Sequence, residues 1–263
     1  TNLSEDEAEE IESGTKTEGN ASAVRESDSD AAELLDLLPP FEADDNIQVL
    51  LKALEQEKDN DSRSDLLREI VEGIQAAGRL DVAAVYAGML AHEQPEPKNQ
   101  LVAGALFRNA NRTPNLLQDT VAFRKFSDEA IHFLEDVLAV EPDNENAKIE
   151  LGLAYVEARS PGLSMQGILK IREVADANPQ NTEALFHLGG FSLETGQFDK
   201  AEGRFRSILE VEPGNARAKY FLGVSLREQG KTAEYTKWMT EVAEQQQDPE
   251  LAAAAQASLK NNQ

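Results

Sequence analysis

The chain has no cysteine among its 263 residues. It can therefore form no disulfide, offer no thiolate nucleophile and build no cysteine metal site, and its cysteine usage leaves the redox compartment open. Aromatic residues are also sparse, at 6%. No apolar run reaches the length of about 18 residues that a membrane-spanning helix needs. These absences exclude a disulfide scaffold and a thiol enzyme, and the sequence predicts no direct membrane span.

Basic residues are scarce relative to acidic ones. The 25 Lys and Arg residues stand against 49 Asp and Glu residues, which gives a formal net charge of −24. Nucleic-acid backbones are bound mainly through clusters of Lys and Arg, which this sequence lacks. Anionic membrane surfaces attract the same kind of cluster. We therefore expect neither nucleic acid nor a membrane surface as a partner.

The excess of acid is concentrated at the beginning of the chain. Residues 1–46 hold fifteen Asp and Glu against Lys16 and Arg25. Such a segment cannot bury enough apolar surface to offset the entropy lost on ordering. Only the leucine-rich run from Ala31 to Leu38 breaks the pattern. The sequence thus predicts a disordered acidic tail over residues 1–46.

A spaced pattern recurs in the C-terminal half. Leu188-Gly189 and Gly196 are followed, 34 residues later, by Leu222-Gly223 and Gly230. Gly189 has no side chain and so lets a neighbouring helix approach closely. Gly196 can adopt the left-handed backbone that ends a helix. A second helix then begins near Asp199, presents a small contact residue and an apolar face, and ends before a proline: Ala201, Phe205, Ile208, Leu209 and Pro213.

This spacing resembles the tetratricopeptide repeat, a helix-turn-helix unit that stacks into an α-solenoid. The resemblance implies an all-α fold of about five repeats between capping helices. The predicted organisation is a disordered tail at 1–46, an N-terminal capping helix at 47–63, repeat units at 64–97, 98–144, 145–181, 182–215 and 216–249, and a C-terminal capping helix at 250–263. The second unit contains an insertion, Asn109 to Lys125, between its two helices.

The segments Ser164 to Ile168 and Ser192 to Ala201 narrow the resemblance. They are similar to a group of bacterial tetratricopeptide proteins that carry one hydrophobic anchor ahead of the repeats. Here the chain opens at Thr1 with no methionine and no apolar run, which is consistent with a trimmed or processed product. The resemblance implies a protein of the bacterial cell envelope, tethered by an anchor missing from this chain, with a cytoplasmic protein as the alternative.

The same resemblance implies a binding surface. In this family the first helices of successive repeats form a concave groove that usually receives an extended peptide or a partner helix. The repeat phase predicts the following groove residues: Ile149, Leu153, Val156, Phe186, His187, Gly190, Glu194, Tyr220, Val224 and Arg227. Packing between helices is the competing interpretation of the apolar members. The basic clamp for a C-terminal carboxylate, found in chaperone-binding members, is not present.

Motifs for chemistry are weak. Gly230-Lys231-Thr232 lacks the preceding glycine of a phosphate-binding loop, because Ser225 stands there, so we interpret it as a repeat turn. His92, His132 and His187 fall in different units without the spacing of metal ligands. No catalytic residue, metal site or cofactor is therefore predicted, and no small-molecule substrate is expected.

Three functions remain open at this point. The first is a non-catalytic scaffold or adaptor that binds a protein partner, whose identity the sequence does not give, in the groove. The second is a structural subunit locked into one large, membrane-associated complex. The third is an enzyme or metal-dependent protein whose site lies in the insertion from Asn109 to Lys125. The repeat pattern and the missing site chemistry favour the first.

Overall fold

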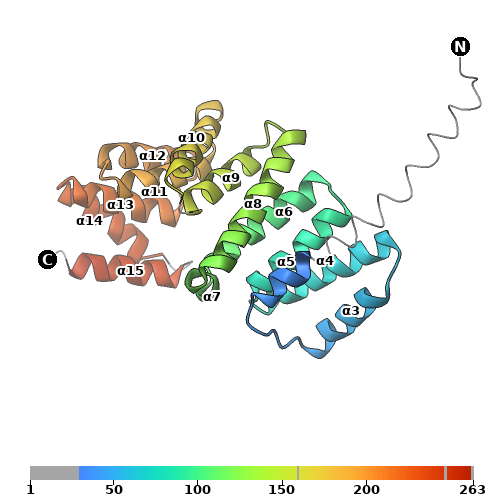
Figure 1. Cartoon of the computed structure of the whole chain (residues 1–263). Coiled ribbons are helices and arrows are strands. Elements are labelled where there is room, and N and C mark those ends of the chain that lie inside the picture. Colours follow the sequence, from blue (N-terminus) through green and yellow to red (C-terminus); the bar gives the residue numbers. More distant parts are fainter. Residues whose placement is uncertain (1–29, 159, 246–247, 262–263) are drawn as a thin grey trace, which may run out of the picture. The chain divides into compact units, whose positions relative to one another are not determined.

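The computed structural model describes residues 30–158, 160–245 and 248–261. Over these ranges the chain consists of α-helices joined by turns and contains no strand (Figure 1), which confirms the all-α prediction. The chain divides into two compact units, residues 1–160 (unit 1) and 161–263 (unit 2). The boundary falls inside the predicted repeat 145–181. The pairing of its two helices as one repeat therefore stays a prediction.

Unit 1 contains α3 (Asp45–Gln56), α4 (Asn60–Ala76), α5 (Leu80–Glu93), α6 (Pro97–Ala110), α7 (Pro114–Gln118), α8 (Thr120–Val140) and α9 (Glu145–Glu157). α3, α4, α5 and α6 pack in succession, and α8 packs against α6, α7 and α9. The aromatic centre of the unit is Phe107, whose ring stacks on Phe133 at 5.9 Å and meets Phe126 edge-on at 5.1 Å. All three side chains are buried.

The prediction of a disordered tail needs correction at its C-terminal end. Residues 1–29 lie outside the described residues, but residues 30–36 are helical. Ala31, Leu34 and Leu38 are 6%, 7% and 9% exposed and belong to the core of unit 1. The Arg79 guanidinium also donates hydrogen bonds to the backbone carbonyls of Pro39 and Pro40, at 3.0 and 3.2 Å. Burial of the leucine-rich run offsets the entropy that the run loses on ordering. The acidic residues around it have too little apolar surface to do the same.

The predicted capping helix over 47–63 is wrong, because two helices occupy that span. α3 ends at Gln56, and α4 begins at Asn60. The break lies at Asp59, whose carboxylate accepts a hydrogen bond from the backbone N–H of Ser62 at 2.9 Å and so caps α4. Arg63, in the first turns of α4, then bonds the carbonyl of Leu54 at 3.1 Å and pins the two helices together.

The insertion from Asn109 to Lys125 also has structure of its own. α6 runs to Ala110, and the short helix α7 buries Leu116, which is 1% exposed. Asp119 then caps α8 by accepting hydrogen bonds from the N–H groups of Val121 and Ala122. The second helix of this unit therefore begins at Thr120, inside the predicted insertion.

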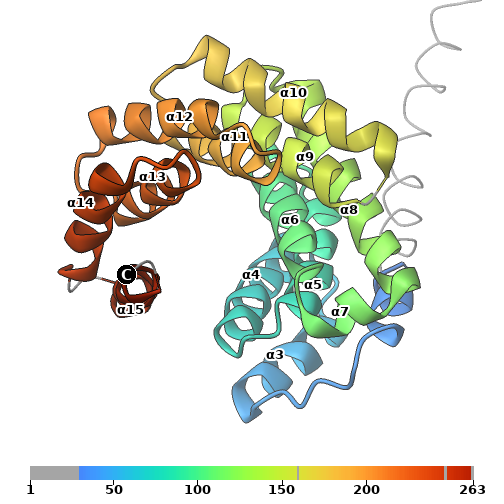
Figure 2. The same ribbon diagram turned by 90° about the vertical axis from the view of Figure 1, so that its left-hand side faces the viewer.

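Unit 2 contains α10 (Pro161–Ala177), α11 (Thr182–Glu194), α12 (Phe198–Val211), α13 (Ala216–Glu228), α14 (Thr232–Ala243) and α15 (Pro249–Lys260). α11 packs on α12 and α13 on α14, while α15 packs against α14 at the predicted position of the C-terminal cap (Figures 1 and 2). Gly196 and Gly230 end α11 and α13 with φ values of 71° and 74°. This is the left-handed conformation that their place in the repeat predicts.

At Gly189, α11 and α12 approach each other closely. A Cβ atom on this residue would stand 2.7 Å from Cζ of Phe205, a ring that is fully buried. The predicted close approach at Gly189 is therefore present. Gly190, the next residue on the same helix, has no neighbouring atom within 4 Å of the same position. The two adjacent glycines thus differ sharply in the space around them.

Gly189→Ala and Gly190→Ala should therefore change stability in opposite directions. We expect Gly189→Ala to lower the free energy of unfolding by about 1–3 kcal/mol, because the Phe205 ring has no room to move. Gly190→Ala should raise it by up to about 1 kcal/mol, since alanine is the better helix former. Urea denaturation followed by the fluorescence of Trp238, the single tryptophan, measures both. Equal effects of the two variants would contradict this placement of the helices.

Candidate functional site

The helices α11 and α13 are the first helices of two predicted repeats, and they contact each other. Each begins in the same way. The Asn181 side chain accepts a hydrogen bond from the N–H of Ala184 at 2.8 Å, and Asn215 accepts one from Ala218 at 2.9 Å. These asparagine caps satisfy N–H groups that the helix itself leaves free. The recurring cap starts both helices at the same register of the repeat.

Three phenylalanine rings join α11, α12 and α13. The Phe186 ring lies 5.9 Å from Phe205 and 5.5 Å from Phe221, both edge-on, while Phe205 and Phe221 stack at 5.8 Å. Phe205 is fully buried, and the other two are half-buried. The Arg217 guanidinium lies 4.4 Å above the Phe186 ring, a cation–π distance. The cluster therefore has two half-buried rings packed on one fully buried ring.

Six of the predicted groove residues, which we name the α11–α13 face, follow helical spacing on these two helices: Phe186, Gly190, Glu194, Tyr220, Val224 and Arg227. Phe186, Gly190, Tyr220 and Val224 are half-buried. Glu194 and Arg227 are exposed and carry opposite charges. His187 is half-buried beside Phe186, with ring centroids 6.1 Å apart. That these residues bind a partner stays a prediction.

The remaining predicted groove residues lie on α9, in unit 1. Ile149 and Leu153 are 0% and 4% exposed, whereas Val156 is half-buried. The expectation that Ile149 and Leu153 face a groove is therefore corrected, since buried side chains do not present a surface to a partner. The apolar residues of α9 are spread around most of its circumference. Helical phase alone therefore did not distinguish the buried sides of α9 from a side that faces a groove.

Sequence reasoning missed two members of the aromatic cluster as site residues, Phe221 and Arg217. The 34-residue register places Phe221 at the position of His187, and Arg217 at that of Glu183. That register was an available signal. However, the packing of Phe221 between Phe186 and Phe205 depends on the tertiary approach of α12 and α13, which spacing does not give.

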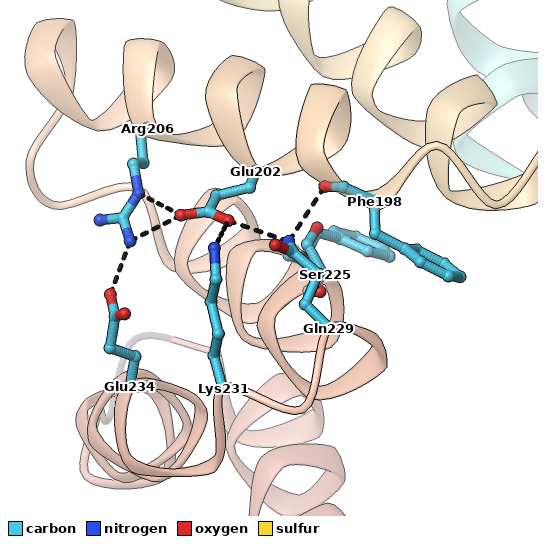
Figure 3. Close-up of polar contacts among 8 residues, drawn as sticks. Phe198, Glu202, Arg206, Ser225, Gln229, Lys231 and Glu234 are labelled. Atoms are coloured by element: carbon cyan, nitrogen blue, oxygen red, sulfur yellow. Dashed lines mark hydrogen bonds and ion pairs between the residues drawn. The ribbon is translucent and has the colours of Figure 1, made fainter.

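A polar network around Glu202 holds the second helix of this site in place (Figure 3). The Glu202 carboxylate accepts hydrogen bonds from Lys231 Nζ at 2.7 Å, Gln229 Nε2 at 2.9 Å and Arg206 Nε at 2.9 Å. Arg206 also donates to Glu234 at 2.6 Å. Burial by itself raises the pKa of Glu202, but these donors outweigh it and lower the pKa to about 2. The network ties α12 to α13, α14 and the turn between them.

Within the described ranges, no group of three or more His, Asp or Glu side chains is arranged as metal ligands would be. His92 instead contacts the Phe133 ring at 5.1 Å, and His132 lies 3.7 Å from Asp136. None of the described helices combines the length and the apolar character that crossing a membrane requires.

Residues 193–259, from the end of α11 through most of α15, match the family model of the tetratricopeptide repeat. This part of the chain carries tetratricopeptide repeats. The Gly230 turn and the whole Glu202 network lie in the matched span. No curated protein matches the chain by sequence.

Solved structures show the same tetratricopeptide fold. TTC0263, a tetratricopeptide repeat protein of Thermus thermophilus, matches with a TM-score of 0.57 at 17% identity, over 74% of this chain and 98% of that one. MamA from Desulfovibrio magneticus RS-1, from residue 41 to its end, matches with a TM-score of 0.52 at 18% identity, over 71% and 95% of the two chains. The tetratricopeptide solenoid predicted from the sequence is thus confirmed as the fold.

Proposed function

We propose that this chain is a non-catalytic protein-interaction scaffold and that a peptide or partner helix binds at the α11–α13 face. The observation that carries the proposal is the half-exposed aromatic cluster under Arg217. Aromatic and arginine side chains dominate the energy of protein interfaces where they are desolvated. Phe186 and Phe221 also pack on the fully buried Phe205, which restricts their side chains before binding and reduces the entropy lost on binding.

The open space beside Gly190 supports the same proposal. No atom lies within 4 Å of the position that a Cβ atom would take there, although Phe186 stands one turn before it on the same helix. A partner side chain can therefore approach the α11 backbone next to the aromatic edges. Glu194 and Arg227 supply charges of opposite sign on the same face. Such exposed charges affect the rate and salt dependence of association more than its strength.

A photo-crosslinking residue in place of Gly190 tests this proposal in cells. The matched control places the same residue at Gly203 on α12, which also has open space around its Cβ position. We expect position 190 to capture a defined partner and position 203 to capture it weakly or not at all. Capture from Gly203 at the yield of Gly190 would place the contact elsewhere and overturn the proposal.

Tyr220→Ala provides a second test of the α11–α13 face. Phe186 lies against the buried Phe205 ring, so its loss would disturb the core, whereas the Tyr220 ring meets the half-buried Phe221 at 5.4 Å. We expect Tyr220→Ala to lower crosslinking from position 190 by about tenfold, the effect of roughly 1.4 kcal/mol of binding free energy. Val211→Ala, at an exposed apolar residue of α12, is the control and should leave the yield unchanged. An unchanged yield in Tyr220→Ala would argue against the α11–α13 face.

The same crosslinking experiment distinguishes a scaffold that exchanges partners from a structural subunit of one complex. A subunit locked into one complex should give one set of products in fixed stoichiometry, and these products should not exchange with added free chain. We further propose a location at the bacterial cell envelope, which rests on the resemblance to anchored tetratricopeptide proteins. Fractionation of native cells tests that location, and recovery in the cytoplasmic fraction alone would reject it.

A further inference from the structure

A pocket of about 170 Å³ lies between α10, α11 and α12, within unit 2. Its apolar lining comes from Met165, Ile168, Leu188 and Phe191. Cavities of about 150 Å³ in protein cores can hold a benzene-sized group. Met165 is 61% exposed and stands at the rim, so the pocket opens to solvent. Its size and lining suit one medium-sized apolar side chain.

This pocket is separate from the α11–α13 face. Leu188 and Ser192 of α11 line the pocket, while Phe186 and Gly190 belong to the face. Helical spacing of about 100° per residue places these two pairs on different sides of α11. The pocket is therefore a second candidate surface, and it does not depend on the function proposed above.

Three basic side chains line the same pocket: Arg172, Lys200 and Arg204. The Arg204 guanidinium donates a hydrogen bond to the carbonyl of Leu188 at 2.7 Å and another to the Ser192 hydroxyl. Lys200 donates to the Gln197 amide oxygen at 2.6 Å. The contacts of Arg204 direct its guanidinium toward α11, while Lys200 lies against the turn between α11 and α12. Burial and the neighbouring Arg172 lower the pKa of Arg204, as expected when like charges lie close together.

What distinguishes this cluster is the lack of an acidic partner. Among the described residues, no carboxylate lies within ion-pair distance of Arg172, Lys200 or Arg204. The chain as a whole has 49 acidic residues against 25 basic ones. Elsewhere in unit 2, Arg206 and Lys231 are neutralised by carboxylates. Three cations facing one apolar pocket therefore leave positive charge available to an external acid.

We propose that this pocket binds an acidic segment of a partner protein, which inserts one apolar side chain between α10 and α11. Flanking carboxylates of that segment then lie against Arg172, Lys200 and Arg204. Charge complementarity selects the acidic segment, and the lining selects an apolar residue within it. Arginine binds carboxylates through charge-assisted hydrogen bonds, which are stronger than bonds between neutral groups. A polyanion without an apolar group, such as nucleic acid, would leave the pocket empty.

The test uses the full chain and fluorescein-labelled peptides of the form Gly-Ser-Asp-Glu-Xaa-Glu-Asp-Ser-Gly, in which Xaa is Phe, Leu or Met. One comparison peptide has every acid replaced by its amide, and another has Gly at Xaa. Fluorescence anisotropy gives the affinities. We expect at least one acidic peptide to bind, and both comparison peptides to bind about tenfold more weakly or worse. If none of the three acidic peptides binds below about 1 mM, which corresponds to a very weak complex, the proposal is wrong.

Two pocket variants locate the binding. Arg172→Glu combined with Lys200→Glu reverses two exposed charges, and Met165→Glu makes the rim acidic. Each should weaken binding by about tenfold or more. The control, Lys237→Glu combined with Lys260→Glu, makes the same change in net charge at exposed sites outside the pocket. It should change affinity by less than about threefold at physiological salt, where distant charges are screened.

Circular dichroism checks that every variant keeps its helices. Equal losses in pocket and control variants would mean general charge attraction and would overturn the proposal. A labelled oligothymidylate is the final arm. If it binds more tightly than the acidic peptides, and the pocket variants abolish that binding, the site takes nucleic acid instead of an acidic segment.

Discussion

Arg108→Ala is expected to lower the free energy of unfolding by about 3–5 kcal/mol, the cost of removing one partner from a buried ion pair. The Arg108 side chain, on α6, is 6% exposed, and it reaches two carboxylates of α9. Its guanidinium bonds Glu150 at 2.6 Å and Glu157 at 3.2 Å. Burial by itself lowers the pKa of Arg108, but these carboxylates raise it, so the arginine stays charged. Its loss leaves the half-buried Glu150 carboxylate without this partner.

Two further variants separate the unpaired charge from simple loss of packing. Arg112 also pairs with Glu157, at 2.5 Å, but its side chain is 59% exposed, so Arg112→Ala should cost less than about 1 kcal/mol. Arg108→Met combined with Glu150→Gln removes both charges and should recover most of the stability lost in Arg108→Ala. Hydrogen exchange of the α6 and α9 amides in the full chain measures the effect in unit 1. Similar losses for Arg108→Ala and Arg112→Ala would contradict it.

The C-terminal repeats could be predicted from the sequence because their signals are local. Gly196 and Gly230 stop helices through the conformation of their own backbone, and Asn144, Asn181 and Asn215 cap helices through bonds to residues three positions later. Gly189 marks a close helix contact because nothing larger fits against Phe205. Each signal acts within one repeat, so the 34-residue spacing carries it.

The N-terminal segment was harder to predict because charge and apolar content compete there. The average acidity of residues 1–46 favours disorder, yet Ala31, Leu34 and Leu38 are buried against unit 1. An average over the whole segment conceals a short amphipathic run. The helix break at Asp59 had a local signal, since Asp-Asn-Asp-Ser is rich in capping residues. The prediction of one capping helix over 47–63 takes no account of that signal.

The candidate sites depend on contacts that sequence spacing does not encode. Phe221 joins the aromatic cluster only because α12 and α13 pack against each other. The basic pocket likewise collects Arg172, Lys200 and Arg204 from α10 and α12, and the charge of the whole chain gives no hint of it. In a solenoid, residues of neighbouring helices meet through the stacking of units. Which residues meet must therefore be read from the structure.

Glu202 provides the second large effect, which should appear in the dependence of stability on pH. Its pKa is lowered from 4.5 to about 2 in the folded chain, since the donors from Lys231, Gln229 and Arg206 outweigh the effect of burial. A group whose folded pKa is depressed stabilises the fold fully above its unfolded pKa and loses that contribution as pH falls toward its folded pKa. A difference of this size corresponds to about 3 kcal/mol.

We therefore expect Glu202→Gln to lower the free energy of unfolding by about 3 kcal/mol at pH 7, an upper value because its side chain is 14% exposed. The difference between the wild type and this variant should shrink steadily from pH 4.5 to pH 2, the interval between the unfolded and folded pKa values. Carboxylates outside this network titrate equally in both chains, so the difference reports Glu202 and the Glu234 that shares Arg206 with it. Urea denaturation at each pH, followed by Trp238 fluorescence, measures it.

Glu234→Gln is the control, because Glu234 shares Arg206 but is 51% exposed and should contribute less than about 1 kcal/mol. A difference that stays constant down to pH 2 would show that the Glu202 charge does not hold α12 to the turn before α14. The variant would then be less stable only because its packing had changed.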